Sequence, residues 1–216
     1  MNFQRKFSVF KSIPIGIKTQ NMPKAKETRD FIVEKTAPVF NKKGFAGTSL
    51  TDMEKATGLT KGSIYNNFGN KDEVALAAFD FNLNKVNRLI NEEMSKHQSV
   101  RKQLLVYATI YGDTMLKDFF PIGGCPILNT AIDSDDTHPE LRKKAKTAVL
   151  NWKNKVVELI EQGIAQKEFK STNSSEDTAL MIIASIEGAI MISKVTGNAT
   201  YMKSVLQSVE KIIQTL

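Results

Sequence analysis

The stretch from Thr60 to Phe68 combines polar side chains at a spacing that suits contact with a nucleic acid. Thr60 can cap a helix, because a threonine hydroxyl accepts a hydrogen bond from a free N–H of the first turn. In the helix that follows, only Ile64 is strongly apolar, so the remaining side chains face outward. A cation, a hydroxyl, a phenol and an amide on one exposed face suit phosphates and base edges in a major groove. They belong to Lys61, Ser63, Tyr65 and Asn66.

A second short helix precedes this one, and a tight turn joins the two. Thr48 or Ser49 can cap it, and Gly58 suits its end because glycine tolerates a positive φ. Its apolar residues recur at a spacing of three, and they are Leu50, Met53 and Ala56. A helix of about two turns is marginal alone, so neighbours must hold the reading helix. Gly62 would let the backbone of the reading helix approach a binding partner closely, because glycine has no side chain.

A surface helical hairpin that binds nothing would show the same general pattern, so the detailed residue types matter. Over residues 26–74 the sequence resembles the N-terminal domain of the tetracycline-repressor (TetR) family. The matching residues are Gly44-Phe45, Thr48-Ser49, Ala56, the run from Gly58 to Phe68, and Lys71-Asp72-Glu73. Asn67 stands where many members carry His, and Glu54 where many carry Ala. These two departures are expected to affect the phosphate contacts or the preferred DNA sequence, and they leave the resemblance to the family intact.

The resemblance implies an all-α homodimeric transcription regulator that binds a palindromic operator in double-stranded DNA and responds to a small-molecule effector. We expect an extension over 1–21, a three-helix DNA-binding domain with its helix-turn-helix over 22–69, and a helical effector-binding and dimerisation domain over 70–216. Two reading helices would enter successive major grooves. The expected DNA-contacting residues are Thr48, Ser49, Thr60, Lys61, Gly62, Ser63, Tyr65, Asn66 and Lys71.

The charge of the chain is unevenly distributed along the sequence. The net charge is +7, residues 1–21 contribute four basic residues and no acids, residues 22–72 a net +3, and residues 73–216 a net of zero. Nucleic-acid binding predicts this asymmetry, although short segments also fluctuate in charge. The single cysteine favours a reducing cytoplasm. The sequence contains no run of eighteen apolar residues, so no transmembrane helix is expected.

Residues 1–21 fall outside the resemblance. The segment is basic and apolar but lacks the uninterrupted apolar run of a signal peptide. Met22 precedes Pro23 and a favourable helix start, so the preferred interpretation is that the functional chain begins at Met22. The alternative is a flexible basic arm that touches the DNA backbone or minor groove.

The rest of the chain reads as helices with short breaks. Pro38 should kink the first helix, because proline removes a backbone hydrogen bond and crowds the preceding turn. Thr137 and Glu140 form a predicted capping box. By resemblance, residues 146–168 and 176–196 would pair with their copies in a four-helix dimer interface. Besides the hairpin, the expected helices cover 24–43, 70–96, 99–117, 126–132, 137–167, 176–195 and 201–216.

The resemblance also implies an effector pocket in the C-terminal domain, although core packing would explain its aromatic residues equally well. Its candidate lining residues are Phe79, Leu83, Tyr107, Tyr111, Met115, Phe119, Cys125, Asn129 and Trp152. Asn129 is either a hydrogen-bonding group of the pocket or a structural amide. Cys125 would sense oxidants only with a depressed pKa and exposure.

The sequence contains no motif that favours catalysis, a cofactor or a metal. The two histidines lack metal-ligand spacing, and the acidic run 133–136 lacks the glycine and spacing of a calcium loop, so a solvated loop is preferred. Two alternative functions stay open. The first is an enzyme that uses the C-terminal cavity, and this alternative predicts turnover of a bound compound. The second is a helical ligand carrier or partner-binding module, which would differ from a regulator in lacking salt-dependent binding to duplex DNA.

Overall fold

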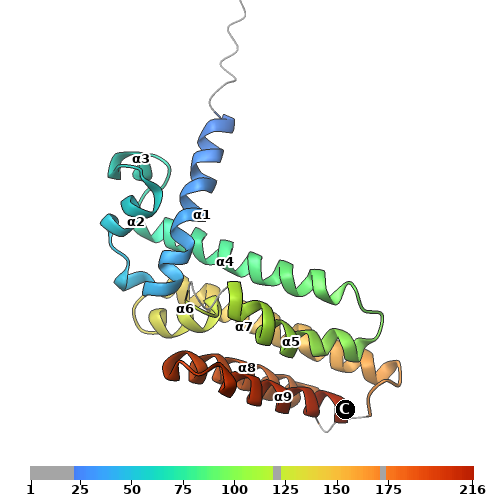
Figure 1. The fold of residues 1–216 in the computed structure, drawn as a ribbon. Coiled ribbons are helices and arrows are strands. Elements are labelled where there is room, and N and C mark those ends of the chain that lie inside the picture. Colours follow the sequence, from blue (N-terminus) through green and yellow to red (C-terminus); the bar gives the residue numbers. More distant parts are fainter. Residues whose placement is uncertain (1–21, 119–122, 171–173) are drawn as a thin grey trace, which may run out of the picture.

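The structure is a computed structural model, which describes residues 22–118, 123–170 and 174–216. The described residues form α-helices without a strand, which confirms the predicted all-α fold (Figure 1). The interpretations of residues 1–21 lie outside the described residues. The helices are α1 Met22–Gly47, α2 Leu50–Thr57, α3 Lys61–Tyr65, α4 Lys71–Met94, α5 Val100–Asp118, α6 Pro126–Ser134, α7 Pro139–Ala165, α8 Ser175–Thr196 and α9 Ala199–Thr215.

Helices α1 to α3 form a small domain that leans on the first half of α4 (Figure 1). Its centre consists of apolar side chains that are almost completely buried. They are Ile32 of α1, Met53 of α2, Ile64 of α3 and Phe68, which follows α3. The first half of α4 adds Val74 and Ala78 to this core. The same helix continues into the C-terminal body, so it belongs to both halves of the molecule.

The predicted helix boundaries around the hairpin are confirmed. Ser49 caps α2 and forms a capping box with Asp52, and Gly58 ends that helix at a φ of 69°. Thr60 caps α3 by accepting a hydrogen bond from the Ser63 N–H. In the body, Pro126 occupies the first turn of α6 as expected.

Two local predictions are wrong. The backbone stays helical through Pro38 and breaks instead at Gly44, whose φ of 72° and ψ of 176° are non-helical. Glu34, whose carbonyl loses its partner to Pro38, lies on the exposed side, where water can bind that oxygen. The cap of α7 is not Thr137 but His138, whose Nδ1 accepts from the Leu141 N–H. Pro139 takes the first helical position and so fixes the preceding residue as the cap.

The C-terminal body consists of three layers, with α4 on one side, α5 and α7 in the middle, and α8 and α9 on the other side (Figure 1). Helix α9 packs on α5 and α8 through Met202, Leu206, Val209 and Ile213. Among the described helices, α8 alone is long and apolar enough to cross a membrane. A helix in a core or a subunit interface has the same composition, so this is weak evidence for a membrane span.

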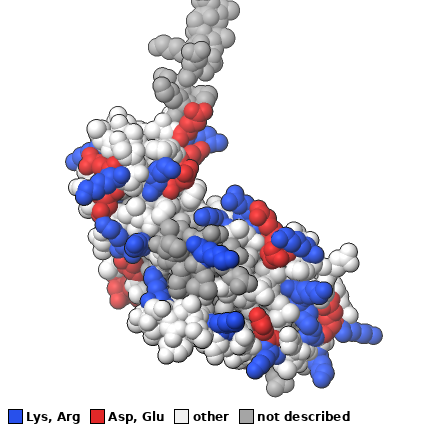
Figure 2. All heavy atoms as spheres, in the orientation of Figure 1, with Lys and Arg blue, Asp and Glu red and all other residues white. Residues whose placement is uncertain are grey.

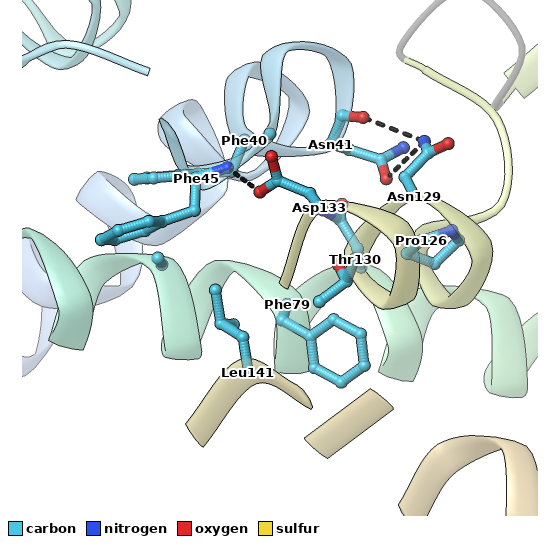
Figure 3. Close-up of a pocket in the computed structure, with 12 residues that line it drawn as sticks. Phe40, Asn41, Phe45, Phe79, Pro126, Asn129, Thr130, Asp133 and Leu141 are labelled. Carbon is cyan, nitrogen blue, oxygen red and sulfur yellow. Dashed lines mark hydrogen bonds between the residues drawn. The ribbon is translucent and has the colours of Figure 1, made fainter. Parts of the chain in front are cut away.

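Helix α6 fastens the body to the end of α1. The Asp133 carboxylate accepts a hydrogen bond from the Phe45 N–H, immediately after the break at Gly44 (Figure 3). A Cβ on Gly44 would lie 2.5 Å from Asp133 Oδ1, so the close approach requires glycine. Asp133 therefore belongs to the junction, and Ser134 is fully buried within α6. The predicted solvated loop over 133–136 is wrong for these two residues.

A pair of amides fastens the other end of α6 to α1. Asn129 Nδ2 donates to the Asn41 carbonyl at 3.0 Å (Figure 3). It also donates to the Gly123 carbonyl at 2.7 Å. Asn41 Nδ2 donates in turn to the Gly124 carbonyl at 2.9 Å. These bonds assign Asn129 a structural role. The space enclosed at this junction is about 20 Å³, about enough for one water molecule.

A buried acid–thiol contact links α6 to α8. The Cys125 Sγ lies 2.9 Å from Glu187 Oε1 and donates to it. Burial, with Glu187 beside it, raises the pKa of the Cys125 thiol well above its usual value. Because the thiolate is the form that reacts with oxidants, this environment disfavours redox sensing. Burial also raises the pKa of Glu187 to about 7, against the smaller opposite effect of the Cys125 hydrogen bond.

We expect Asp133→Ala to lower the free energy of unfolding by about 1–2 kcal/mol, because the Phe45 N–H loses a charged acceptor in a partly buried position. Asp136→Ala is the matched control. It removes an exposed carboxylate from the same acidic run and should change stability by less than about 0.5 kcal/mol. Urea unfolding of both variants measures the difference. Equal losses would show that Asp133 contributes only its charge.

We expect the raised pKa of Glu187 to make the free energy of unfolding fall as the pH rises from the ordinary carboxyl pKa of 4.5 to about 7. A carboxyl group whose pKa is higher in the folded state than in the unfolded state stabilises the fold while it is protonated. This contribution is complete below the pKa of the unfolded state and is lost as the pH rises through the pKa of the folded state. Glu187→Gln should remove this decline, whereas Glu161→Gln, an exposed acid on α7, should keep it. Urea midpoints below, within and above that window test this. A decline that persists in Glu187→Gln would exclude Glu187 as its source.

Candidate nucleic-acid interface

The reading helix α3 is short and is held by its apolar side. Ile64 is fully buried, and Phe68, which follows the helix, is 1% exposed. The opposite side carries Lys61, Gly62 and Asn66, which are exposed, while Ser63 and Tyr65 are half-buried. The predicted polar groups thus lie on one small helix, and Tyr65 also packs against the core.

Glu54 connects the two helices of the hairpin. Its Oε1 accepts a hydrogen bond of 2.8 Å from the Lys61 N–H, which is a free donor at the start of α3. The carboxylate fixes α3 relative to α2 and also introduces a negative charge beside the reading helix. This residue is one of the two departures from the family pattern noted in the sequence, and an alanine at this position would offer no such acceptor.

Helix α1 holds the other end of the reading helix. The Arg29 guanidinium lies 3.8 Å from the centre of the Phe68 ring and donates to the Asn67 carbonyl. Asn67 Nδ2 donates to the Ser63 carbonyl at 2.9 Å. Asn67, the second departure, therefore provides a partner for a carbonyl of α3 from just beyond the C-cap residue Asn66. Sequence reasoning missed the role of Arg29, because no local pattern identifies a partner 38 residues away. It also missed the role of Glu54, whose partner Lys61 lies seven residues away in the next helix.

The remaining predicted contact residues lie in different environments. Thr48 is fully buried and donates to the Gly44 carbonyl, so its hydroxyl is committed to the protein. Ser49 is exposed, but its hydroxyl takes part in the capping box with Asp52. Lys43 lies 2.6 Å from Asp52 and holds the pKa of that carboxyl well below its usual value. Lys71 Nζ lies 4.3 Å from the centre of the Phe45 ring.

Space and charge at α3 are compatible with close contact. A Cβ on Gly62 would meet only Thr60 Oγ1 at 4.0 Å, so nothing within the described protein requires glycine there. On the face drawn in Figure 2, acidic and basic side chains alternate over both the small domain and the body. Local positive charge at α3 therefore comes from individual lysines, chiefly Lys61.

Four of the predicted effector residues come together in a cleft of about 230 Å³ between α4 and α7. They are Leu83, Tyr107, Tyr111 and Trp152. Phe79 and Asn129 instead line the small junction space between α1, α4 and α6 (Figure 3). Cys125 is buried against Glu187 and lines neither of these two spaces. The side chain of Met115 and the whole of Phe119 lie outside the described residues.

Comparison with known proteins agrees with this geometry. The family model described as "Bacterial regulatory proteins, tetR family" matches residues 32–78. The model described as "Tetracyclin repressor-like, C-terminal domain" matches residues 101–209. A curated relative, an HTH-type transcriptional regulator of Lactococcus lactis, is 28% identical over 83% of this chain and 89% of its own length. The HTH-type transcriptional regulator TtgR of Pseudomonas putida is 26% identical over 77% of this chain and 80% of its own.

Solved structures show the same architecture at higher identity. A TetR-family transcriptional regulator from Cytophaga hutchinsonii is 48% identical, with a TM-score of 0.84 over 90% of this chain and 96% of that one. A TetR transcriptional regulator from Chloroflexus aurantiacus is 36% identical, with a TM-score of 0.83 over 89% and 96%. With the hairpin and both family models in agreement, this chain belongs to the TetR family of DNA-binding transcriptional regulators.

Proposed function

We propose that this protein is a homodimeric cytoplasmic repressor that binds a palindromic operator and releases it when a small molecule binds the C-terminal body. The observation that carries the proposal is the reading helix α3. Its apolar side is held by the core and by Arg29, and its polar side is left exposed. Helix α3 is the shortest of the described helices, and its outward side carries Lys61, Ser63 and Tyr65.

The structure supports a specific division of contacts. Lys61, Ser63 and Tyr65 would contact bases or the groove edge, and Gly62 would allow the backbone to approach. The phosphate contacts would come from Ser49, Thr60, Asn66 and Lys71. We leave Thr48 out of the contact set because its side chain is fully buried.

The surface of α8 supports the proposed dimer. Its outward face carries large apolar side chains that the described chain leaves exposed, namely Leu180, Met181, Met191, Ile192 and Val195. Ala184 and Gly188 lie on the same face, where small residues permit close approach of a second helix. An exposed apolar face of this extent favours a subunit contact. The predicted pairing of 176–196 with its copy therefore remains our proposal.

The proposed response to an effector follows from the connections between the two halves. A ligand can shift the DNA-binding form only by binding one form of the protein more tightly than the other. The cleft lies against α4, and α6 is fastened to α1 at Asn41 and Phe45. A change in α4 or α6 would therefore reposition the small domain as a unit.

Selection of bound duplexes from a random DNA pool, with the full chain, tests the proposal. We expect enrichment of one palindrome. Val195→Glu places a charge on a residue that is 80% exposed and should abolish both dimerisation and enrichment. Gln207→Glu adds the same charge to the polar face of α9 and should change neither. Failure of a folded, dimeric protein to enrich any sequence would favour the carrier interpretation.

Lys71→Ala should weaken binding to every duplex and reduce the slope of log affinity against log salt by about one, because one phosphate contact is lost. The reduced salt dependence separates a phosphate contact from a base contact, which would instead change sequence preference. Lys102→Ala removes an exposed cation from α5 and should leave both quantities unchanged. If Lys71→Ala keeps the wild-type slope, the proposed phosphate contact of Lys71 is wrong.

A further inference from the structure

The cleft between α4 and α7 has two chemically distinct parts. Its inner side is formed by buried aromatic and aliphatic side chains of α4, α5, α6 and α7. Its rim carries exposed polar side chains, which are Asn87, Asn91, Asn151 and Lys155. An apolar cavity with a few polar groups is the usual form of a small-molecule site. At about 230 Å³ it lies below the roughly 300 Å³ at which pockets for drug-sized ligands begin.

The inner side presents flat aromatic surfaces. The rings of Tyr111 and Trp152 are stacked, with centroids 5.7 Å apart and planes 12° apart. The Tyr107 ring lies 5.9 Å from that of Trp152 at 37°. Offset stacking favours a planar aromatic guest over a branched aliphatic one.

Trp152 supplies a hydrogen-bond donor that the fold leaves unused. Its Nε1 is buried and has no partner among the described residues, although the side chain lines the cleft. A buried N–H without an acceptor carries a desolvation cost, which an acceptor atom on a ligand would remove.

The charged groups near the cleft do not favour an ionic ligand. Lys155 is the one cation among the lining residues, and its Nζ lies 3.1 Å from Glu158 at the exposed rim. Burial raises the pKa of both Tyr107 and Tyr111, so their phenols remain neutral. An anion placed on the inner side would therefore lose its hydration without meeting a positive charge.

We propose that this cleft binds a small, uncharged, planar aromatic molecule that carries a hydrogen-bond acceptor, such as an aryl ketone, with the acceptor bound to Trp152 Nε1. The inference rests on the proposed function, since it specifies the class of effector. On this proposal, the polar groups on the inner side of the cleft select the ligand by donating hydrogen bonds to it rather than by charge.

Trp152 is the one tryptophan of the chain, so its fluorescence reports occupancy of the cleft directly. Three matched probes are titrated into the full-length dimer: acetylnaphthalene, ethylnaphthalene, which lacks the acceptor, and naphthoate, which is an anion. Calorimetry provides a second measure of affinity. We expect acetylnaphthalene to bind about tenfold more tightly than ethylnaphthalene, the equivalent of one hydrogen bond to a buried donor, and naphthoate to bind most weakly.

Trp152→Phe keeps an aromatic ring and removes the N–H. By calorimetry, it should reduce the preference for the ketone to near unity, whereas Tyr201→Phe, which removes an exposed hydroxyl on α9, should keep it. The proposal is overturned if no probe binds, if ketone and hydrocarbon bind equally to the wild type, if naphthoate binds most tightly, or if the preference survives Trp152→Phe.

Operator binding, measured in the same samples, separates this proposal from the proposed function. If the ketone binds as expected but the operator stays bound, the ligand class stands and the effector role fails. If another compound releases the operator without changing Trp152 fluorescence, the effector site lies elsewhere and the effector role of the cleft fails, while the ligand class is decided by the three probes. A protein that never binds an operator contradicts the proposed function alone.

Discussion

A helix of five residues has no stability of its own, and the recognition surface depends on how the rest of the small domain holds it. Burial of Ile64 and Phe68 provides most of that support, because each loses nearly all its contact with water. Two charged contacts then fix the orientation of α3: Glu54 at its start and Arg29 at its end. Both reach α3 from other helices, so the exposed face of α3 does not have to contribute to folding.

Local rules predicted much of this fold because they act over short distances. Helix caps at Ser49 and Thr60 and the left-handed glycine at Gly58 depend on neighbours within a few residues. The cap of α7 was misplaced by one residue, since a proline at the first helical position outweighs a threonine–glutamate pair. Pro38 shows the limit of propensity, because a long helix packed on α4 tolerates the lost hydrogen bond.

Contacts between distant residues could not be predicted, because polar residues give no sign of which partner they will meet. Asp133 belongs to an acidic run that looks solvated, yet it accepts the Phe45 N–H from 88 residues away. Asn129 looked equally suited to a pocket or to a structural amide, and the carbonyls of Asn41 and Gly123 decided between them. The aromatic residues of the cleft were identified because a large apolar side chain must be buried somewhere, although its neighbours stay unknown.

These polar contacts also determine how the two halves of the molecule are connected. The junction encloses about 20 Å³, too little for a ligand, whereas the cleft of about 230 Å³ is separate and shares α4 and α6 with it. Close-packed interiors shift between discrete arrangements rather than deform continuously. Because hydrogen bonds fasten both ends of α6 to α1, displacing α6 would break them or carry the end of α1 along. Gly44 lies between these two attachments, and its non-helical backbone lets the end of α1 turn toward Asp133.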